Sequence, residues 1–390
     1  MAIHRYLGLA AMVFLALAAI TGSILCFAQP LDEALNADLF QQGRSTNPVD
    51  PVIAVGRFAA LHPNIQVLSA PVRVARDQTI SITVTAAPGK EPLKHDQIFL
   101  DRTNGREIGG RLMSPGWNRR QIVAGIAEFH YNLLAGDWGR WLMGAMALGW
   151  LISNFVGFYL TLPERRPFWK SWKRAWRFSF RSAFARLMLD IHRASGLWLL
   201  IGVTILALTS VALNFYSEAY EPTVVKISPL KRSLFDQPAP FPEGASPDLT
   251  YDDALRLARN EAIRKELDWL PATVLYRPDW NLYGVTFTDN GNLNYHRLGP
   301  IYYYFNANTG AFIHEVNPYN DSAGLVMIRM LYPLHSGKIA GTVTIIIVFV
   351  LGMATLEMCV TGAYLWWKRR KLRRGGGAKR KSLMPGSNNI

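Results

Sequence analysis

The sequence is poor in cysteine, and four long stretches of it almost lack charge. Only Cys26 and Cys359 occur among 390 residues, and no Cys-x-x-Cys-His sequence is present, which excludes covalent attachment of haem. No Gly-x-Gly-x-x-Gly follows a predicted strand. The sequence therefore gives no sign of a dinucleotide-binding module of its own.

The four stretches with little charge lie at about 6–28, 141–162, 194–215 and 339–367. Each is long enough for a hydrocarbon core about 30 Å thick, which needs roughly 20 helical residues. We therefore expect four transmembrane helices. The two cysteines would lie at different depths in the first and fourth of these helices, so no disulfide is expected.

The formal net charge of +14 is distributed unevenly. Eight basic residues lie in the short loop 163–190 and nine more in the tail after Trp367, whereas the two long loops carry nearly equal numbers of acidic and basic residues. Short basic segments stay on the cytoplasmic side of a membrane. We therefore predict a bacterial inner-membrane protein with both termini in the cytoplasm. The charge is explained by topology and gives no reason to expect nucleic-acid binding.

Two similar units follow each other along the chain. His4–Leu9 opens the first apolar stretch, and His192–Leu197 opens the third, 188 residues later. Thr21 and Thr209 each follow the opening histidine by 17 residues, and His335 follows His130 by 205. A repeat of this kind indicates an internal duplication of a helix, an outer domain and a helix.

Both long loops show the alternation of helices and strands that is typical of a small α+β domain. We expect a helix followed by three strands and a turn in each. The expected fold class is thus an α-helical membrane protein with four transmembrane helices and two periplasmic α+β domains. The expected segments are a first membrane helix at 1–28, an outer domain at 29–116, an outer-surface segment at 117–138, a second membrane helix at 139–162, a basic cytoplasmic loop at 163–189, a third membrane helix at 190–216, a second outer domain at 217–326, a second outer-surface segment at 327–338, a fourth membrane helix at 339–367 and a basic cytoplasmic tail at 368–390.

One histidine lies at the mouth of each predicted membrane helix. His4 and His192 are expected at the inner face, and His130 and His335 at the outer face. Two neutral imidazoles that face each other can ligate one haem iron, and helix bundles supply such sites. A single histidine at a helix end is usually an interfacial or capping residue, and a zinc or copper site needs three or four clustered ligands. Because the four histidines are paired and repeated, we favour haem ligation.

Other residues near these histidines could serve the same cofactor. Small residues one turn away leave room for a flat macrocycle, and cations could pair with its propionates. Glu357, the carboxylate within a predicted membrane helix, is expected to hydrogen-bond the inner haem site, to move a proton, or to bond a neighbouring helix as a neutral carboxyl. The glycine and cationic candidates are Gly8, Gly196, Gly341, Arg5, Arg193, Arg140, Arg329 and Lys338.

Four motifs together cover nearly the whole chain. They are His4-Arg5…Gly8-Leu9, His130…Leu133-Leu134…Gly139, His192-Arg193…Gly196-Leu197-Trp198 and Leu334-His335-Ser336-Gly337…Thr361-Gly362-Ala363-Tyr364-Leu365-Trp366-Trp367. With these motifs the sequence resembles the PepSY-associated transmembrane family, also called iron-regulated or PiuB-like membrane proteins. The outer domains resemble two PepSY domains.

The resemblance implies a function for the four histidines. Members such as the FoxB-type ferrisiderophore reductases are di-haem proteins, which implies that His4 and His192, and His130 and His335, hold two non-covalent b-type haems. It further implies an oxidoreductase that reduces a ferric siderophore in the periplasm and releases Fe(II). The electron donor would be a quinol or a cytoplasmic reductase. The alternatives are a siderophore or iron permease, and an accessory membrane protein whose PepSY domains bind a partner without redox chemistry.

Overall fold

A computed structural model describes residues 2–43, 48–75, 77–231, 233–292 and 296–382. Within these ranges, three helices are long and apolar enough to cross a membrane: α1 (Ala2–Leu25), α6 (Gly136–Thr161) and the part of α13 that ends at Leu372. The helices α8 (Phe184–Trp198) and α9 (Leu200–Asn214) meet this criterion only as a pair. By length and composition, the described residues thus contain three helices that can cross a membrane, or four if the pair forms one span.

The third predicted membrane helix, at 190–216, is not one straight helix. The axes of α8 and α9 are bent by 71°, and the break lies at Leu199, whose φ of −103° and ψ of 7° are not helical. Asp190 and Arg193 lie on α8, whereas α9 carries no charged residue. Because a charged side chain is costly in hydrocarbon, only α9 has the composition of a membrane interior.

The fourth membrane helix continues further than the sequence indicated. Helix α13 runs from Thr342 to Ser382, so much of the basic tail expected at 368–390 is helical. Lysine, arginine and leucine, which have high helix propensity, fill 368–374 and extend the helix beyond its apolar part. Residues 383–390 lie outside the described residues.

The two long loops contain the same order of elements. One helix and four strands occur in each, where three strands had been predicted. The fourth strand of each half had not been predicted; in β4 two of the five residues are glycines, which are unfavourable in strands. The first half comprises α4 (Pro51–Leu61), β1 (Ile65–Pro71), β2 (Ile80–Ala86), β3 (Gln97–Leu100) and β4 (Glu107–Arg111), and the second comprises α11 (Tyr251–Arg264), β5 (Leu270–Arg277), β6 (Leu282–Thr288), β7 (Ile301–Asn306) and β8 (Phe312–Val316).

The two halves share a single antiparallel sheet, although two separate domains had been predicted. The strand order is β4-β3-β2-β1-β5-β6-β7-β8, and the halves meet where Ser69 of β1 pairs with Leu275 of β5. Each of these strands would otherwise expose an unpaired edge. Their pairing removes both edges and joins the two halves into one body.

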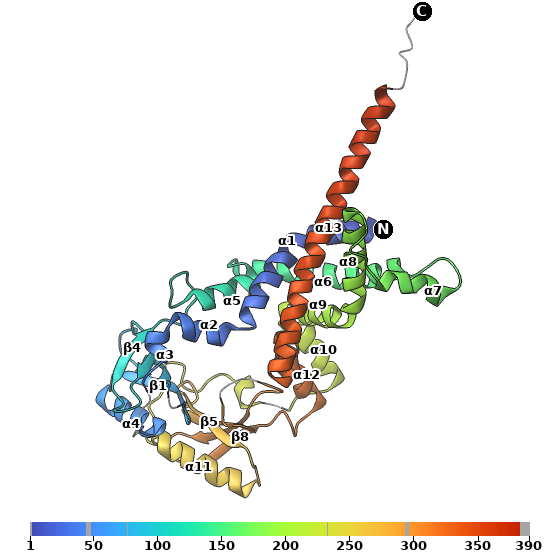
Figure 1. Cartoon of the computed structure of the whole chain (residues 1–390). Helices are drawn as coiled ribbons and strands as arrows, with labels where there is room; N and C mark the ends of the chain where they lie inside the picture. Colours follow the sequence, from blue (N-terminus) through green and yellow to red (C-terminus); the bar gives the residue numbers. More distant parts are fainter. Residues whose placement is uncertain (1, 44–47, 76, 232, 293–295, 383–390) are drawn as a thin grey trace, which may run out of the picture.

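Helices α4 and α11 cover the same face of this sheet (Figure 1). Because side chains of a strand alternate between faces, Tyr303 and Phe305 of β7 enter the core under these helices, where they are at most 2% exposed. Tyr302 and Tyr304 consequently point to the opposite face. That face is directed toward the apolar helices.

Short helices lie between the sheet and the membrane helices (Figure 1). They are α2 (Ala28–Leu35), α3 (Ala37–Phe40), α5 (Ile122–Asn132), α10 (Glu221–Ile227) and α12 (Ala323–Ser336). The predicted outer-surface segments correspond to α5 and α12. The aromatic and basic loop between α6 and α8 contains α7 (Phe168–Trp172) and a 3₁₀ turn at Lys173–Trp176.

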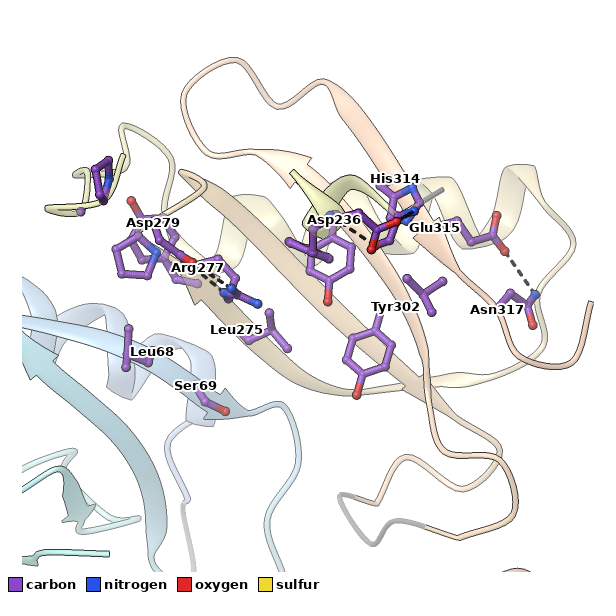
Figure 2. A pocket seen from close by; sticks show the side chains of 18 of the residues that line it. Leu68, Ser69, Asp236, Leu275, Arg277, Asp279, Tyr302, His314, Glu315 and Asn317 are labelled. Carbon is purple, nitrogen blue, oxygen red and sulfur yellow. Dashed lines mark hydrogen bonds and ion pairs between the residues drawn. The ribbon is translucent and has the colours of Figure 1, made fainter. Parts of the chain in front are cut away.

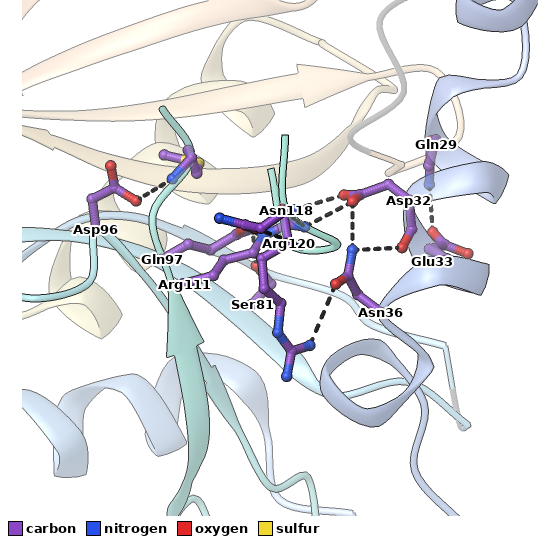
Figure 3. Close-up of polar contacts among 11 residues, drawn as sticks. Gln29, Asp32, Glu33, Asn36, Ser81, Asp96, Gln97, Arg111, Asn118 and Arg120 are labelled. Carbon is purple, nitrogen blue, oxygen red and sulfur yellow. Dashed lines mark hydrogen bonds and ion pairs between the residues drawn. The ribbon is translucent and has the colours of Figure 1, made fainter. Parts of the chain in front are cut away.

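A partly buried ion pair attaches the first half of the sheet to α2 (Figure 3). The Arg111 guanidinium donates to both carboxylate oxygens of Asp32, at 2.7 and 2.6 Å, and its Nε donates to Gln97 at 2.7 Å. The side chains of Arg111 and Asp32 are 9% and 19% exposed. A two-pronged contact of this kind fixes orientation as well as distance, so it holds the edge of the sheet against the segment that follows α1.

Candidate functional site

The first candidate site is the histidine pair far from the sheet, which we call the distal pair. His4 begins α1 and His192 lies on α8, and their ring centroids are 6.3 Å apart with the planes inclined by 66°. Nδ1 of His4 lies 2.8 Å from the Ser153 hydroxyl and 3.2 Å from the Ser153 carbonyl. Nδ1 of His192 lies 2.9 Å from the Thr361 hydroxyl. The structure therefore brings together the two histidines that had been assigned to the inner face.

The second candidate site is the proximal pair, close to the sheet. His130 on α5 and His335 on α12 have ring centroids 6.3 Å apart and planes inclined by 47°. Their Nδ1 atoms lie 2.9 Å from the Thr21 hydroxyl and 3.0 Å from the Thr209 hydroxyl. The histidines that had been assigned to the outer face are thus also neighbours.

The hydroxyl contacts determine which ring nitrogen carries hydrogen. Thr21, Thr209 and Thr361 each donate to a carbonyl of their own helix one turn earlier, at 2.8 to 2.9 Å. A hydroxyl has one hydrogen, so its oxygen accepts from the imidazole Nδ1–H. The Ser153 carbonyl can only accept as well. All four rings therefore carry hydrogen on Nδ1 and a lone pair on Nε2, as a metal ligand requires.

The ring separation agrees with two imidazoles on opposite sides of one metal ion. A metal–nitrogen bond of about 2.0 Å and a ring centroid about 1.1 Å beyond each nitrogen give about 6.2 Å between centroids. In the described part of the chain, no group of three or more His, Cys, Asp or Glu side chains is placed to hold a metal. Two ligands per site fit haem, which brings four nitrogens of its own.

Three glycines lie against the histidine rings, and sequence reasoning did not assign them this role. A Cβ on Gly22 would lie 3.0 Å from His130, and one on Gly157 would lie 3.1 Å from His4. At Gly362 the distance to His192 would be 3.4 Å. In the sequence, Gly22 and Gly362 each directly follow a threonine that contacts a histidine. This contact arises from the packing of the helices, so the sequence alone did not reveal the role of the glycines.

The three glycines that had been predicted to approach a haem do not contact the histidine rings. A Cβ on Gly8 or on Gly341 would meet no atom within 4 Å, and one on Gly196 would meet only the Met358 sulfur, at 3.7 Å. These positions border open space and do not support the rings. Their assignment to haem approach stays a prediction.

Two of the cations predicted to bind propionates already have carboxylate partners. Arg140 pairs with Glu218 at 2.6 Å, and Arg193 pairs with Asp190 at 3.0 Å. The Arg140 guanidinium, together with the Trp141 indole, lowers the pKa of Glu218 to about 2. The other three candidates lie over aromatic rings. Arg5 is 4.6 Å from the Tyr6 centroid, and Arg329 is 5.7 Å from the Tyr302 centroid. Lys338 is 5.6 Å from the Tyr332 centroid.

Glu357 lies beside the distal pair. Its backbone carbonyl accepts the Thr361 hydroxyl that holds His192. Its Oε1 atom is buried and has no hydrogen-bond partner among the described residues. Glu357 therefore lies one helical turn before the residue whose hydroxyl contacts His192, and its role at this site stays a prediction.

Comparison with known proteins identifies the family of the chain. No curated protein matches it. The model of one family, described as PepSY-associated TM region, matches residues 1–369, which is nearly the whole chain, and this confirms the predicted resemblance. Together with the apolar helices, the match shows a membrane protein. The chain belongs to the family of the PepSY-associated TM region.

Proposed function

We propose that this membrane protein is a di-haem oxidoreductase that passes electrons across an inner membrane to a ferric siderophore in the periplasm. The observation that carries the proposal is the pair of sites at which two imidazoles stand 6.3 Å apart. Each ring in these sites directs its hydrogen to a hydroxyl or a carbonyl and keeps a lone pair on Nε2. Bound there, b-type haem would supply a carrier of single electrons.

The separation of the two pairs supports transfer across the membrane. His4 and Thr21, the partner of His130, lie on the same helix α1 and are 17 residues apart. At 1.5 Å per residue this is about 26 Å along the axis, close to the thickness of the hydrocarbon core. The basic loop and tail favour a cytoplasmic position for the distal pair under the positive-inside rule.

The residues of this chain have three tasks in the proposed function. The four histidines hold the cofactors, and the hydroxyls of Thr21, Thr209, Thr361 and Ser153 orient their rings. Packed apolar helices keep water away, and the resulting low polarity is one of the means by which a protein adjusts redox potential.

Reduction of the acceptor explains how iron would be released. The ferric ion gains one electron and becomes Fe(II), while the chelator keeps its oxygen donors. Fe(II) is a softer and less charged ion, so hard oxygen donors hold it far less tightly. The electron donor, a quinol or a cytoplasmic reductase, is a separate molecule in this proposal.

The experiment follows electrons from the purified protein to iron. Protein reduced with dithionite and freed of excess reductant is mixed with a ferric tris-hydroxamate and a chromogenic Fe(II) chelator. We expect Fe(II) to form, and we expect His130→Ala and His335→Ala each to slow its formation at least tenfold. His62→Ala is the matched control, because His62 stacks on Phe58 and belongs to neither pair.

Two outcomes would contradict the proposal. One is Fe(II) formation by both proximal-pair variants at the rate of the unmodified protein. The other is siderophore uptake by proteoliposomes that contain no electron donor, which would favour a permease.

A further inference from the structure

A large cavity lies on the face of the sheet opposite the core, mostly over its second half, and it reaches Leu68 and Ser69 of β1 (Figure 2). Its volume is about 1210 Å³, more than the roughly 300–1,000 Å³ of most small-molecule sites. Leu275 of β5 and Tyr302 and Tyr304 of β7 line it, because they alternate with residues that face the core. The strand pattern of the second half thus presents a row of side chains to a space that can hold a large ligand.

One wall of the cavity is aromatic. The rings of Tyr302 and Tyr304 are parallel within 3°, with centroids 6.0 Å apart, and His314 stacks on Tyr304 at 6.4 Å. Phe235, from the 3₁₀ turn Leu234–Asp236, meets Tyr304 edge-on at 5.0 Å. Aromatic surfaces bind the apolar backbone of a ligand with little loss of side-chain freedom.

Helix α12 connects this cavity to the proximal pair. Leu325 and Arg329 of α12 line the cavity, and Arg329 lies over the ring of Tyr302 at 5.7 Å. His335 follows Arg329 by six residues on the same helix, about 9 Å further along its axis. A ligand in the cavity therefore lies next to the site from which it would receive an electron.

The charges that line the cavity do not favour an anion. Lys231 pairs with Asp321 at 3.5 Å, and Arg277 pairs with Asp279 at 2.8 Å. Among the described lining residues, four carboxylates stand against three basic side chains once Glu315 is set aside, because Glu315 pairs with Lys265 on the helix-covered face. Glu243 at the rim forms no ion pair with any described residue. An anionic ligand would have to compete with these carboxylates.

From these four observations we infer that the cavity binds the ferric acceptor and selects uncharged or cationic oxygen-rich chelates over strongly anionic ones. The identification of the ligand as an acceptor rests on the proposed function. A tris-hydroxamate complex of a trivalent metal is uncharged at its centre, whereas a tris-catecholate complex is strongly anionic. The cavity matches the first class in size, charge and aromatic wall.

The experiment measures binding without redox chemistry. Gallium(III) tris-hydroxamate, which cannot be reduced under these conditions, is titrated into the purified full-length protein by calorimetry. We expect Tyr302→Ala to weaken binding at least tenfold. Phe312→Ala is the matched control, because Phe312 contacts Lys265 and Tyr303 on the helix-covered face and should change the affinity less than twofold.

A rim variant tests the charge preference without disturbing the fold. Glu243 is exposed, and we expect Glu243→Lys to weaken binding of an amine-bearing cationic gallium hydroxamate and to strengthen binding of the gallium tris-catecholate. Equal binding by Tyr302→Ala and Phe312→Ala, no binding by the unmodified protein, or tighter binding of the catecholate to it would each overturn the inference. Binding with the expected variant pattern but without any Fe(II) formation would overturn the proposed function alone.

Discussion

The two halves of the sheet share an order of elements but differ in what fills the face toward the membrane. In the first half, Phe40 meets Phe99 of β3 edge-on at 4.9 Å, and the Arg111 guanidinium covers Phe99 at 5.8 Å. In the second half, Phe235 meets Tyr304 of β7 in the same manner at 5.0 Å. Beyond that contact the second half leaves a cavity of about 1210 Å³.

The difference lies in the segment that connects each membrane helix to the sheet. After α1, the helices α2 and α3 fold directly onto the first half and pair Asp32 with Arg111. After α9, a longer segment reaches α11 and places a short 3₁₀ turn and the stretch around Ala245 on the second half. The same scaffold is thus attached to the helices in one half and leaves a cavity mostly over the other.

We expect the largest loss of stability when the ion pair that attaches the first half to α2 is removed. Arg111→Met leaves Asp32 partly buried without its partner, and loss of one member of a buried pair costs about 3–5 kcal/mol. We expect a drop of this size in the free energy of unfolding measured in detergent. Arg277→Met, in the second half, removes a pair whose side chains are 42% and 37% exposed, and should cost about 0–1 kcal/mol. Similar losses in both variants would contradict the assigned roles of the halves.

The next effect concerns what the halves share, the hydroxyl contact to each proximal histidine. Thr21→Val and Thr209→Val remove the acceptors for Nδ1–H of His130 and His335. Loss of such a partner typically costs 10–100-fold in metal affinity. We expect a comparable loss in haem retention for both variants, measured by competition with apomyoglobin, together with a changed midpoint potential.

Serine variants provide the control for these two threonines. Thr21→Ser and Thr209→Ser keep the hydroxyl and should restore both affinity and potential. If valine at either position leaves the potential unchanged, the threonine has only a packing role there.

The smallest expected effect tests a contact between the halves, in which Arg140 of α6 pairs with Glu218 after α9. The pKa of Glu218 is lowered from 4.5 to about 2, chiefly by the hydrogen bond from Arg140. A lowered carboxyl pKa means that the contribution to stability is complete above about pH 4.5 and is lost as the pH falls toward 2. The Trp141 indole donates to Glu218 at 2.8 Å, so tryptophan emission should change in this window. Glu218→Gln should abolish the change, and an unaltered titration would exclude this assignment.

Local patterns in the sequence were enough to predict the helices and the family. Apolar length gave α1, α6 and the apolar part of α13, and the repeated histidine spacing predicted which rings would meet. The bend at Leu199 was missed because neither proline nor glycine occurs there. It becomes understandable only from the contrast between the charged α8 and the uncharged α9.

Features that depend on contacts between distant segments could not be predicted. The pairing of β1 with β5 joins strands about 200 residues apart, and neither strand carries a signal that names its partner. Thr21 and Thr209 were recognised as repeated positions, but their contact with His130 and His335 arises from the packing of helices. The cavity is formed by the side chains of β7 that face away from the core together with the segment before α11, and the sequence does not show that these two parts meet.

The central claim is that each histidine pair holds one haem. The most direct measurement is the pyridine haemochrome content of protein purified from haem-replete cells, for the unmodified chain and for His4→Ala, His130→Ala, His192→Ala and His335→Ala. The account predicts two b-type haems in the unmodified chain and loss of about half of the haem in each variant. A colourless protein, or a haem content that all four substitutions leave unchanged, would contradict it.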